Sequence, residues 1–461
     1  MKIVLINPIN RSYVVMPSIG LGYLARQLLK DKNEVKILNC LKEEMTFDTF
    51  EAFVRGEHYD VYGFQMFSYD FSSVKKHLEI VKFLNPKAIT ILGGAHPSGD
   101  PYGVLKSLDK ADFAFYGEAE IGIRKLIQNL TGSGKNKNLQ AIPGLIWRND
   151  DEVVVNPREF VNDLDSLDFP AWDLQKPEEY PRAPHGAFAK NFPTAPIIIT
   201  RSCPFQCAFC AGKSISGRKL RKRSVDNAIE EIKYLHKNFN VKEIHIEDEC
   251  FTIHKSLVLE FCDKLIKSKT VVTWGLPSGI RLDTIDRELL KTMEEAGCYS
   301  VAVGVEFGSQ RILNLAKKSI TLELIKEKVA LLNETKIKTT GFFMLGFPGE
   351  TKEEIQSTID LSLQLDLDRA QFNNFMPLPG SELWAELEKK GMLSNVDFDK
   401  FFVHNVACVP DGMKESDMKW FQRKAYISFY LRPKIIIKLL KEITSIAHLK
   451  HLVVRFIDAL K

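Results

Sequence analysis

The sequence lacks the marks of several large protein classes. Among its 461 residues there is no apolar run of the roughly 20 residues that a membrane span requires. The opening MKIVLINPIN leads directly into a strand pattern and does not resemble a secretory leader. The formal net charge is only +4, which gives no basic footprint for nucleic acid. We therefore expect a cytoplasmic protein whose thiols stay reduced.

Close pairs of cysteines are also scarce. The cysteines that stand alone in the sequence are Cys40, Cys250, Cys262, Cys298 and Cys408. A structural zinc site or a ferredoxin-like cluster needs a fourth ligand, usually from a second close pair, and the sequence offers no such pair. What is present is one run, Cys203, Cys207 and Cys210, in a CxxxCxxC spacing straight after an apolar strand.

This spacing predicts an iron-sulfur site with an open coordination position. Three thiolates can ligate three irons of a 4Fe-4S cluster, and the fourth iron then stays free to bind a small molecule. An open iron indicates catalysis rather than plain electron transfer. The competing interpretation is a non-catalytic scaffold in which the same cysteines hold zinc or an inert cluster.

The first third of the chain alternates strand and helix patterns. Strands are expected over residues 2–7, 34–38, 61–65 and 88–92, and helices over 20–30 and 71–84. Short Val- and Ile-rich strands separated by helices indicate an α/β fold with a doubly wound parallel sheet. Ligands of such sheets lie beyond the carboxyl ends of the strands. The loops after Asn7, Gln65, Leu92 and Phe115 are therefore candidates for a site.

The remainder predicts a linker, a second α/β domain and a helical end. Residues 131–195 are rich in Pro and Asp but too aromatic for a disordered tether, so we expect a linker that wraps. Strands are then expected over 197–200, 243–247, 271–274, 300–305, 340–345 and 369–375, and helices over 225–239, 255–267, 287–295, 322–334 and 352–365. These six βα units predict an open partial barrel of the TIM type, with its site at the strand carboxyl ends. The expected domains are 1–130, the linker 131–195, the barrel 196–390 and a helical C-terminal segment 391–461.

Two stretches concentrate positive charge. The run Arg218, Lys219, Arg221, Lys222 and Arg223 follows the cysteines, and it is either a solvated loop or a guide for an anionic substrate or reductant. From residue 432 to 461, seven Lys and Arg residues oppose two acidic ones. This apolar and basic tail suits an interfacial helix, or a terminal helix packed on the domain with its lysines in water.

The cysteine run and its surroundings resemble the signature of the radical S-adenosylmethionine enzymes over residues 196–380. In that family the open iron chelates the methionine part of the cofactor, and reductive cleavage of its sulfonium gives a 5′-deoxyadenosyl radical that takes hydrogen from unactivated carbon. The resemblance implies that Cys203, Cys207 and Cys210 bind the catalytic cluster. It also implies that Phe209 covers the adenine.

The resemblance implies further contacts to S-adenosylmethionine around the barrel rim. Glu247 and Asp248, an acidic pair where many members have Gly-Gly-Glu, would face the amino group. Glu306 would accept the ribose hydroxyls and Arg281 would pair with the methionine carboxylate. Gly346 would bring backbone close to the adenine. The alternative for the charged residues is a salt bridge at the rim.

The N-terminal domain resembles the cobalamin-binding domain found upstream in one branch of this family. The matching phrases are Pro17, residues 20–25, 93–97 and 117–120, and the linker phrase from Ile142. Cobalamin contacts are implied at Ser18, Gly20, Gln65, Ser68, Gly93, Gly94, His96, Gly117 and Glu118. Many corrinoid proteins carry a cobalt-binding His in DxHxxG after the first strand, and this chain has none there. Bound cobalamin would lack that ligand, as in the methylating branch; the alternative is a domain that has lost its cofactor.

These features predict a cobalamin-dependent radical S-adenosylmethionine methylase that acts on an unactivated carbon of a small molecule or lipid. One cofactor molecule would methylate cob(I)alamin by polar transfer, a second would generate the radical, and an external low-potential donor would supply electrons. A radical cyclase or rearrangement enzyme of the same branch, like the anaerobic porphyrin ring cyclases, is the alternative. The thiomethylating transfer-RNA branch is disfavoured, because its N-terminal domain supplies three cysteines and this one has only Cys40. We expect no nucleic-acid partner, and membrane contact through the basic tail is an open prediction.

Overall fold

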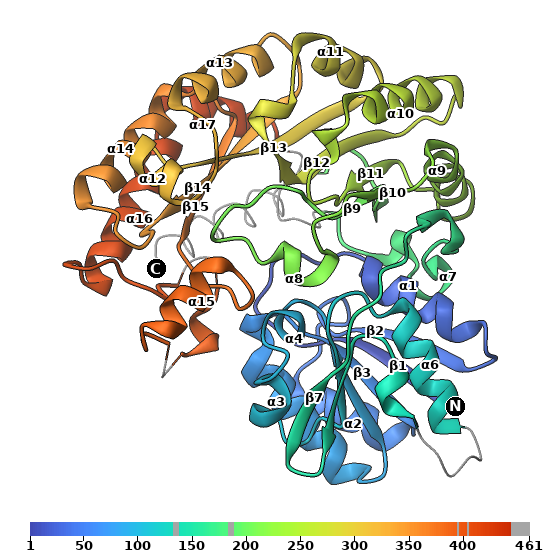
Figure 1. The fold of residues 1–461 in the computed structure, drawn as a ribbon. Helices are drawn as coiled ribbons and strands as arrows, with labels where there is room; N and C mark the ends of the chain where they lie inside the picture. The colour runs from blue at the N-terminus through green and yellow to red at the C-terminus, as the bar shows by residue number, and fades with distance from the viewer. Residues whose placement is uncertain (132–137, 183–188, 394–395, 403–404, 444–461) are drawn as a thin grey trace.

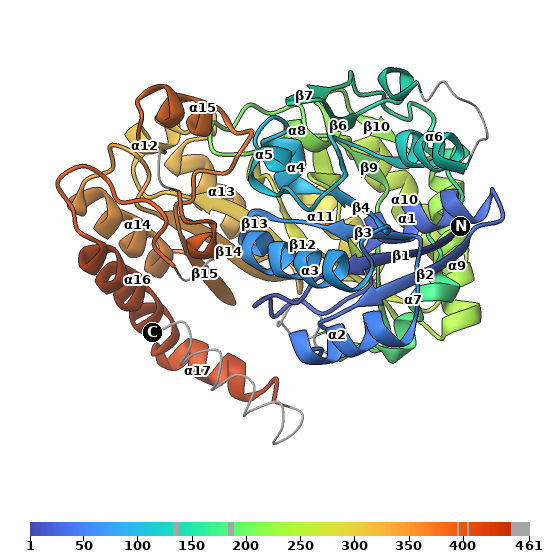
Figure 2. The ribbon, with the colours of Figure 1, turned by 90° about the horizontal axis from the view of Figure 1, so that it is seen from below.

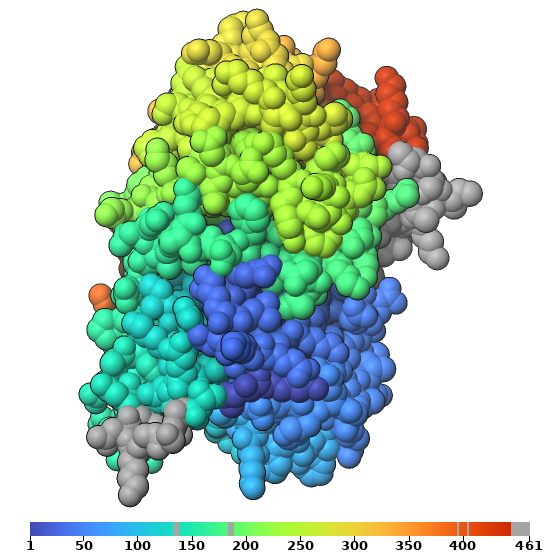
Figure 3. Space-filling view, turned by 90° about the vertical axis from the view of Figure 1, so that its right-hand side faces the viewer, coloured from blue at the N-terminus to red at the C-terminus, as the bar shows by residue number. Residues whose placement is uncertain are grey.

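Two mainly parallel sheets form the framework of the molecule (Figure 1). The computed structural model describes residues 1–131, 138–182, 189–393, 396–402 and 405–443. Figure 1 shows the N-terminal sheet, in blue and cyan, below a barrel-like half in green to orange. In the space-filling view of Figure 3 these two halves meet along a broad boundary. Within the described residues, no helix has the length and apolarity needed to cross a membrane.

The N-terminal sheet follows the order β2-β1-β3-β4-β5-β6-β7 in the described residues. Its parallel strands are β1 (Lys2–Asn7), β2 (Glu34–Asn39), β3 (Val61–Gln65), β4 (Ile89–Gly93) and β5 (Phe113–Phe115). Its helices are α1 (Ile19–Leu29), α2 (Phe47–Gly56), α3 (Phe71–Leu84), α4 (Ala95–Gly99), α5 (Val104–Ser107) and α6 (Glu120–Thr131). Val4 and Leu5 of β1 pack into separate apolar cores, one on each face of the sheet. The predicted doubly wound arrangement is confirmed, because both faces are covered.

The segment predicted as a linker extends this sheet. β6 (Leu145–Asn149) and β7 (Glu152–Val155) add two antiparallel strands at the edge beyond β5. The linker prediction omitted them; β7 alone is the edge strand, and β6 lies between β5 and β7 with Leu145, Ile146 and Trp147 buried. The chain then reaches α7 (Trp172–Gln175), where the buried Trp172 indole donates to Glu231 of the barrel half at 2.9 Å.

The barrel half is an open parallel sheet of order β15-β14-β13-β12-β11-β8 in the described residues. Its strands are β8 (Thr194–Ile197), β11 (Glu243–Ile246), β12 (Thr273–Ile280), β13 (Cys298–Glu306), β14 (Lys338–Leu345) and β15 (Arg369–Asn374). Its helices are α9 (Val225–Phe239), α10 (Lys255–Lys267), α11 (Arg287–Glu295), α12 (Gln310–Leu315), α13 (Leu322–Leu332) and α14 (Lys352–Gln364). The predicted partial barrel is confirmed.

Two of its strands differ from the predicted ranges. β8 ends at Ile197, and the next extended piece, β9 (Thr200–Arg201), pairs antiparallel with β10 (Arg221–Lys222). β12 continues through Pro277, where its pairing with β13 shifts register. Pro is excluded from regular central strands but is tolerated at such irregularities, so a pattern search ends this strand too early.

The C-terminal segment covers the open edge of the barrel. Its elements are α15 (Glu382–Lys389), the short η7 (Phe398–Lys400), α16 (Glu415–Tyr430) and α17 (Pro433–Leu440). The Tyr430 hydroxyl donates to the Ala370 carbonyl of β15 at 2.7 Å, so α16 caps the strand edge. Figure 2 shows α16 and α17 leading away from β15. The last part of the basic tail, residues 444–461, lies outside the described residues.

Candidate functional site

The three cysteines lie on the loop between β9 and α8 (Gly212–Ser216), at the carboxyl end of the barrel strands. We call residues 202–211 the cysteine loop. Its centre is fixed by Ala208, whose N–H donates to the Ala316 carbonyl at 3.0 Å and whose carbonyl accepts from the Leu383 N–H at 3.1 Å. Ala208 is buried, whereas the neighbouring residues on both sides of it in the loop are at least partly exposed. The loop is therefore anchored between its cysteines.

The donor set of this loop suits an iron-sulfur cluster. Burial raises the pKa of the Cys203 thiol to about 11 and also raises the pKa of Cys210. Cysteine binds metal as thiolate, so cluster assembly must release these protons. Among the described residues, no three His, Cys, Asp or Glu side chains are gathered as a ready metal site. The three thiols fit a cluster by chemistry and by position, and binding requires them to turn toward one point.

Arg281, at the end of β12, lies against the cysteine loop. Its guanidinium carbon is 3.7 Å from the centre of the Phe205 ring, and its Nη1 is 3.8 Å from Cys207 Sγ. Asp283 accepts from the guanidinium at 2.9 and 2.8 Å, and the Lys318 carbonyl accepts at 2.8 Å. These contacts fix a cation beside the cysteines, where an anionic group of a ligand would be attracted. The assignment of Arg281 to the methionine carboxylate stays a prediction.

Glu306 ends β13 and forms a buried ion pair with Lys318, at 2.6 Å. Burial disfavours the charged amine, but the Glu306 carboxylate and the Cys207 sulfur outweigh it and raise the pKa of Lys318. Glu306 adopts φ 68°, an uncommon backbone state for a residue with a side chain, which occurs preferentially at functional sites. Sequence reasoning missed Lys318. Its signal was a lysine enclosed between the apolar Ala316 and Ile320.

Glu247 and Asp248, the two acidic residues predicted to face the amino group, have different roles in the structure. Asp248 is buried, and its carboxylate accepts from the Ile199 N–H and from the Thr200 N–H and hydroxyl, each at 2.7 Å. Burial raises the pKa of Asp248 to about 7. This residue holds the turn that ends β8 and presents the cysteine loop. Glu247 is partly exposed and accepts from the Ser278 hydroxyl of β12, so it is the member of the pair placed toward the rim.

Two other predicted contacts belong to packed parts of the barrel. Phe209 is partly buried against the barrel core. Gly346 has φ 80°, and its N–H donates to Glu350 at 2.7 Å. A Cβ at Gly346 would lie 2.4 Å from Met418 Cε of α16, the end of a side chain that can shift, so it is the positive φ that favours glycine here. A role of either residue at the adenine stays a prediction.

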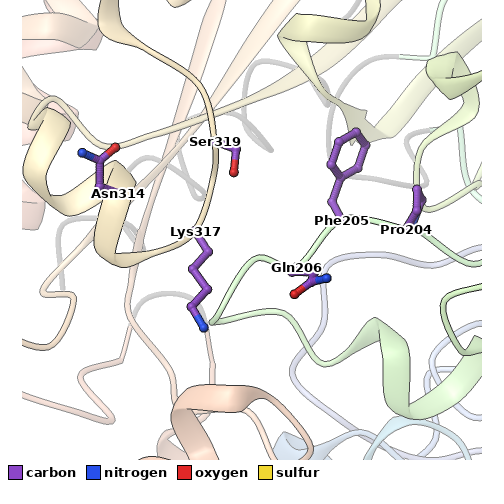
Figure 4. A pocket seen from close by; sticks show the side chains of 6 residues that line it. All are labelled: Pro204, Phe205, Gln206, Asn314, Lys317 and Ser319. Atoms are coloured by element: carbon purple, nitrogen blue, oxygen red, sulfur yellow. The ribbon is translucent and has the colours of Figure 1, made fainter.

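A pocket of about 510 Å³ opens beside the cysteine loop. Figure 4 shows its lining, which comes from the cysteine loop, from α12 and from the connection between α12 and α13: Pro204, Phe205, Gln206, Asn314, Lys317 and Ser319. The Lys317 ammonium, which reaches toward the cysteine loop in Figure 4, also pairs with Glu382 of α15. The cysteine loop is therefore approachable from this side.

The loops at the carboxyl end of the N-terminal sheet bring several predicted cobalamin contacts together. The Ser18 hydroxyl caps α1 and donates to Gln65 at 2.5 Å. The Ser68 hydroxyl lies 3.0 Å from His96 Nδ1. Burial lowers the pKa of His96 to about 4, so the ring is neutral near pH 7, and its Nε2 has no hydrogen-bond partner among the described residues.

Glycines leave the same edge open. An added Cβ at Gly20 or Gly93 would meet no described atom within 4 Å, so backbone is exposed at both places. Gly94 has φ 107°, and a Cβ there would lie 3.0 Å from the Met66 carbonyl oxygen. Open backbone and hydroxyl groups beyond the strand ends fit a large ring system that is bound by shape. These residues are compatible with cobalamin.

Gly117 and Glu118 occupy a different place, the contact between the two halves. A Cβ at Gly117 would lie 3.1 Å from the Ile215 carbonyl oxygen of α8. The Glu118 carboxylate accepts from the Arg221 guanidinium at 2.7 and 2.6 Å and lies 3.3 Å from Arg201. Arg201 also pairs with Glu120 at 2.7 Å. The structure gives Glu118 a joining role, and its cofactor contact stays a prediction.

The open edge of the sheet lies directly beside the cysteine loop. α4, which follows Gly94, packs against α8, which follows the cysteines. A Cβ at Gly99 would lie 2.2 Å from the Pro379 carbonyl oxygen, and one at Gly380 would lie 2.9 Å from Gly99 Cα. The backbones of the two halves therefore touch at this point, and the two predicted cofactor regions lie on neighbouring elements.

Known proteins resemble the chain in both halves. Residues 9–127 match the B12 binding domain and residues 197–362 match the radical SAM superfamily. An uncharacterized methyltransferase of Pyrococcus horikoshii is 30% identical over 448 residues, covering 95% of this chain and 94% of that protein. The anaerobic magnesium-protoporphyrin IX monomethyl ester cyclase of Rubrivivax gelatinosus is 27% identical over 425 residues, covering 90% and 75%. The structure of the radical S-adenosylmethionine methyltransferase TsrM from Kitasatospora setae, with cobalamin and a 4Fe-4S cluster bound, shares the fold with a TM-score of 0.68 at 16% identity, covering 84% and 78%.

Proposed function

Because the chain belongs to the cobalamin-binding branch of the radical S-adenosylmethionine enzyme family, we propose that it methylates an unactivated carbon. The observation that carries the proposal is the contact of α4 with α8, which places the cysteine loop and the open sheet edge side by side. A methyl donor and a radical source must reach the same substrate atom. The two regions predicted to bind them lie next to each other across this contact.

Residues of this chain would hold the cofactors in these two regions. When bound, the cluster and S-adenosylmethionine supply a carbon-centred radical, and cobalamin supplies a methyl group. Cys203, Cys207 and Cys210 would hold the cluster. Arg281 and Lys318, each paired with a carboxylate of the chain, place two cations beside the cysteine loop, and these could exchange their partners for the carboxylate of an amino-acid ligand.

The ion pairs of Glu118 and Glu120 hold the two halves in a fixed relative position. Each of the four side chains in this cluster is at most 10% exposed. Buried pairs of this kind are costly to break, because removal of one partner leaves a charge without compensation. Such a joint limits relative movement of the two cofactor regions, which favours reaction between precisely placed groups.

Turnover products test the proposal. The anaerobically reconstituted protein would be given cobalamin, S-adenosylmethionine, titanium(III) citrate and a candidate substrate. A methyltransferase releases S-adenosylhomocysteine and 5′-deoxyadenosine in equal amounts, together with methylated product. Release of 5′-deoxyadenosine with altered but unmethylated product would support the cyclase or rearrangement alternative. Zinc-loaded, colourless protein that ignores S-adenosylmethionine would support the scaffold alternative.

Cytoplasmic location and lipid contact stay predictions. Within the described residues, α17 is the helix that would contact a lipid surface. Ile437 and Leu440 of this helix are 52% and 59% exposed, and Lys434 and Lys441 are also exposed. A basic helix with exposed apolar residues can bind an anionic lipid surface. Co-sedimentation with anionic and neutral vesicles, with and without residues 432–461, would measure the contribution of the tail. Equal binding with and without the tail would assign it to packing.

A further inference from the structure

The basic run after the cysteines divides into buried and exposed members. Arg221 and Arg223 are 5% and 2% exposed and are held in buried ion pairs. The exposed members are Arg218, Lys219 and Lys222. The run is therefore not a uniform solvated loop, and its exposed cations need a separate explanation.

Cations from two elements border the exposed stretch of the cysteine loop. Arg218, on the connection between α8 and β10, donates from Nη1 to the Phe205 carbonyl at 3.3 Å. Lys317, on the connection between α12 and α13, lines the pocket with Phe205 and Gln206 (Figure 4). Pro204 and Gln206 are exposed. Glu382 offsets part of the Lys317 charge, whereas Arg218 and Lys219 form no ion pair among the described residues.

The radical reaction requires an electron at this loop. Reductive cleavage of S-adenosylmethionine consumes one electron, which the cluster must receive from a partner. Electron transfer weakens steeply with distance, so a partner must approach the exposed stretch between the first two cysteines. A partner with an acidic surface would be attracted and oriented by the cations around this stretch.

We propose that an acidic one-electron donor protein docks on Arg218, Lys219 and Lys317 and reduces the cluster through the exposed stretch of the cysteine loop. The inference rests on the proposed function, since it requires the cluster. One electron leaves the donor, which is oxidised by one electron, and enters the cluster, which passes from the 2+ to the 1+ state. No covalent bond forms or breaks in this step.

The test compares a protein donor with a small reductant. The reconstituted protein would be mixed with an acidic flavodoxin in its hydroquinone form, and cluster bleaching would be followed by stopped-flow absorbance. We expect Arg218→Glu/Lys219→Glu to slow bleaching by about tenfold or more at low salt. Bleaching by titanium(III) citrate should be unchanged, because that reductant needs no docking surface. Titration calorimetry with oxidised flavodoxin should show a matching loss of affinity, without any turnover.

Matched variants distinguish a loss of donor docking from a loss of loop stability. Lys75→Glu/Lys87→Glu makes the same charge change on α3 and the loop after it, where both lysines are exposed, and should leave both rates unchanged. Lys317→Gln should lower the flavodoxin rate by a smaller factor than the double variant. Equal slowing with both reductants would overturn the inference by assigning Arg218 to loop stability. Unchanged flavodoxin binding and rate would overturn it by placing the donor elsewhere. Both readouts are independent of methylated product, so failure of the methyl-transfer proposal would be seen separately.

Discussion

The barrel side and the sheet side of the contact between the halves form two borders whose exposed groups differ in chemistry. On the barrel side, Arg281, Lys318 and Glu306 surround the cysteine loop with fixed charges. On the sheet side, Gly20 and Gly93 leave backbone open, and the nearby polar groups are hydroxyls, an amide and a neutral histidine. The charged border suits a zwitterionic amino-acid cofactor and an iron-sulfur cluster. The open border suits a large ring system recognised mainly by shape.

Removal of one cluster ligand should have the largest effect, and it should act on one border alone. We expect Cys207→Ser to abolish the visible absorbance of the cluster and all turnover, because three thiolates are the minimum set for this site. Cobalamin binding, measured by absorbance after gel filtration, should persist. Cys408→Ser, a partly buried cysteine outside the cysteine loop, is the control and should retain both cofactors. Loss of cobalamin from the Cys207 variant would show that the two borders are not independent.

Breaking the joint between the halves should have the next largest effect. Glu118→Ala leaves the buried Arg201 and Arg221 without a shared partner, and we expect it to lower the free energy of unfolding by about 3–5 kcal/mol. Glu51→Ala, which removes an exposed pair with Arg55, should cost less than about 1 kcal/mol. Urea unfolding of both variants would measure the difference. A loss for Glu118→Ala no larger than that for Glu51→Ala would argue against a stabilising joint.

Removing a cation should weaken only the charged border. Lys318→Met deletes the partner of Glu306 and one cation near the cysteines, so we expect S-adenosylmethionine affinity to fall by about 2 kcal/mol, roughly 30-fold. Equilibrium dialysis with the reconstituted protein would measure it. Lys318→Arg should restore most of the affinity. Cobalamin affinity that falls together with that of S-adenosylmethionine would contradict separate roles for the two borders.

A larger side chain at the open border should weaken cobalamin binding and leave S-adenosylmethionine binding unchanged. Gly93→Val places a branched side chain on exposed backbone, and we expect cobalamin affinity to fall by about tenfold, or about 1.4 kcal/mol. Gly56→Val is the matched control, since a Cβ at Gly56 also meets no described atom within 4 Å and Gly56 ends α2. S-adenosylmethionine binding should be unchanged in both variants. Normal cobalamin binding by Gly93→Val would remove this edge from the cofactor site.

The pH dependence of stability should have opposite signs on the two sides. Burial raises the pKa of Glu350 from 4.5 to about 8, so the folded state holds its proton more tightly and stability falls as pH rises through this window. Glu350→Gln keeps a neutral acceptor and should remove that fall in urea titrations between pH 5 and 8. Burial lowers the pKa of His96 from 6.5 to about 4, so its contribution is instead lost as pH falls. An unchanged pH profile in Glu350→Gln would contradict the buried, neutral carboxyl.

Local patterns gave most of the fold. α3, α9, α10 and α11 have the predicted limits, because their apolar faces repeat at helical spacing and caps such as Ser224 and Asp286 mark their starts. The prediction passed over α2, although its start is marked by the reciprocal cap of Thr46 and Thr49. β6 and β7 were also passed over, although they pair with each other across a short polar turn; the pairing of β6 with β5 is what adds this hairpin to the sheet.

The site was predictable where its residues lie in one run or follow the carboxyl ends of strands of one sheet. The cysteine spacing located the cysteine loop, and Ser18, Gln65, Ser68 and His96 do gather at the predicted sheet edge. The pairs of Glu118 with Arg221 and of Glu306 with Lys318 depend on folding that brings separate elements together. The role of Asp248 could not be predicted either, because its hydrogen bonds to the turn after β8 depend on how the strands pair in the sheet.

The most direct test of the account follows the methyl group itself. The reconstituted protein would be given S-adenosylmethionine with a trideuterated methyl group, cobalamin and a candidate substrate, and the product would be analysed by mass spectrometry. If the chain transfers the methyl group as proposed, we expect product that carries the intact trideuterated methyl group, with equal amounts of S-adenosylhomocysteine and 5′-deoxyadenosine. Turnover that releases 5′-deoxyadenosine while the label never reaches the product would contradict it.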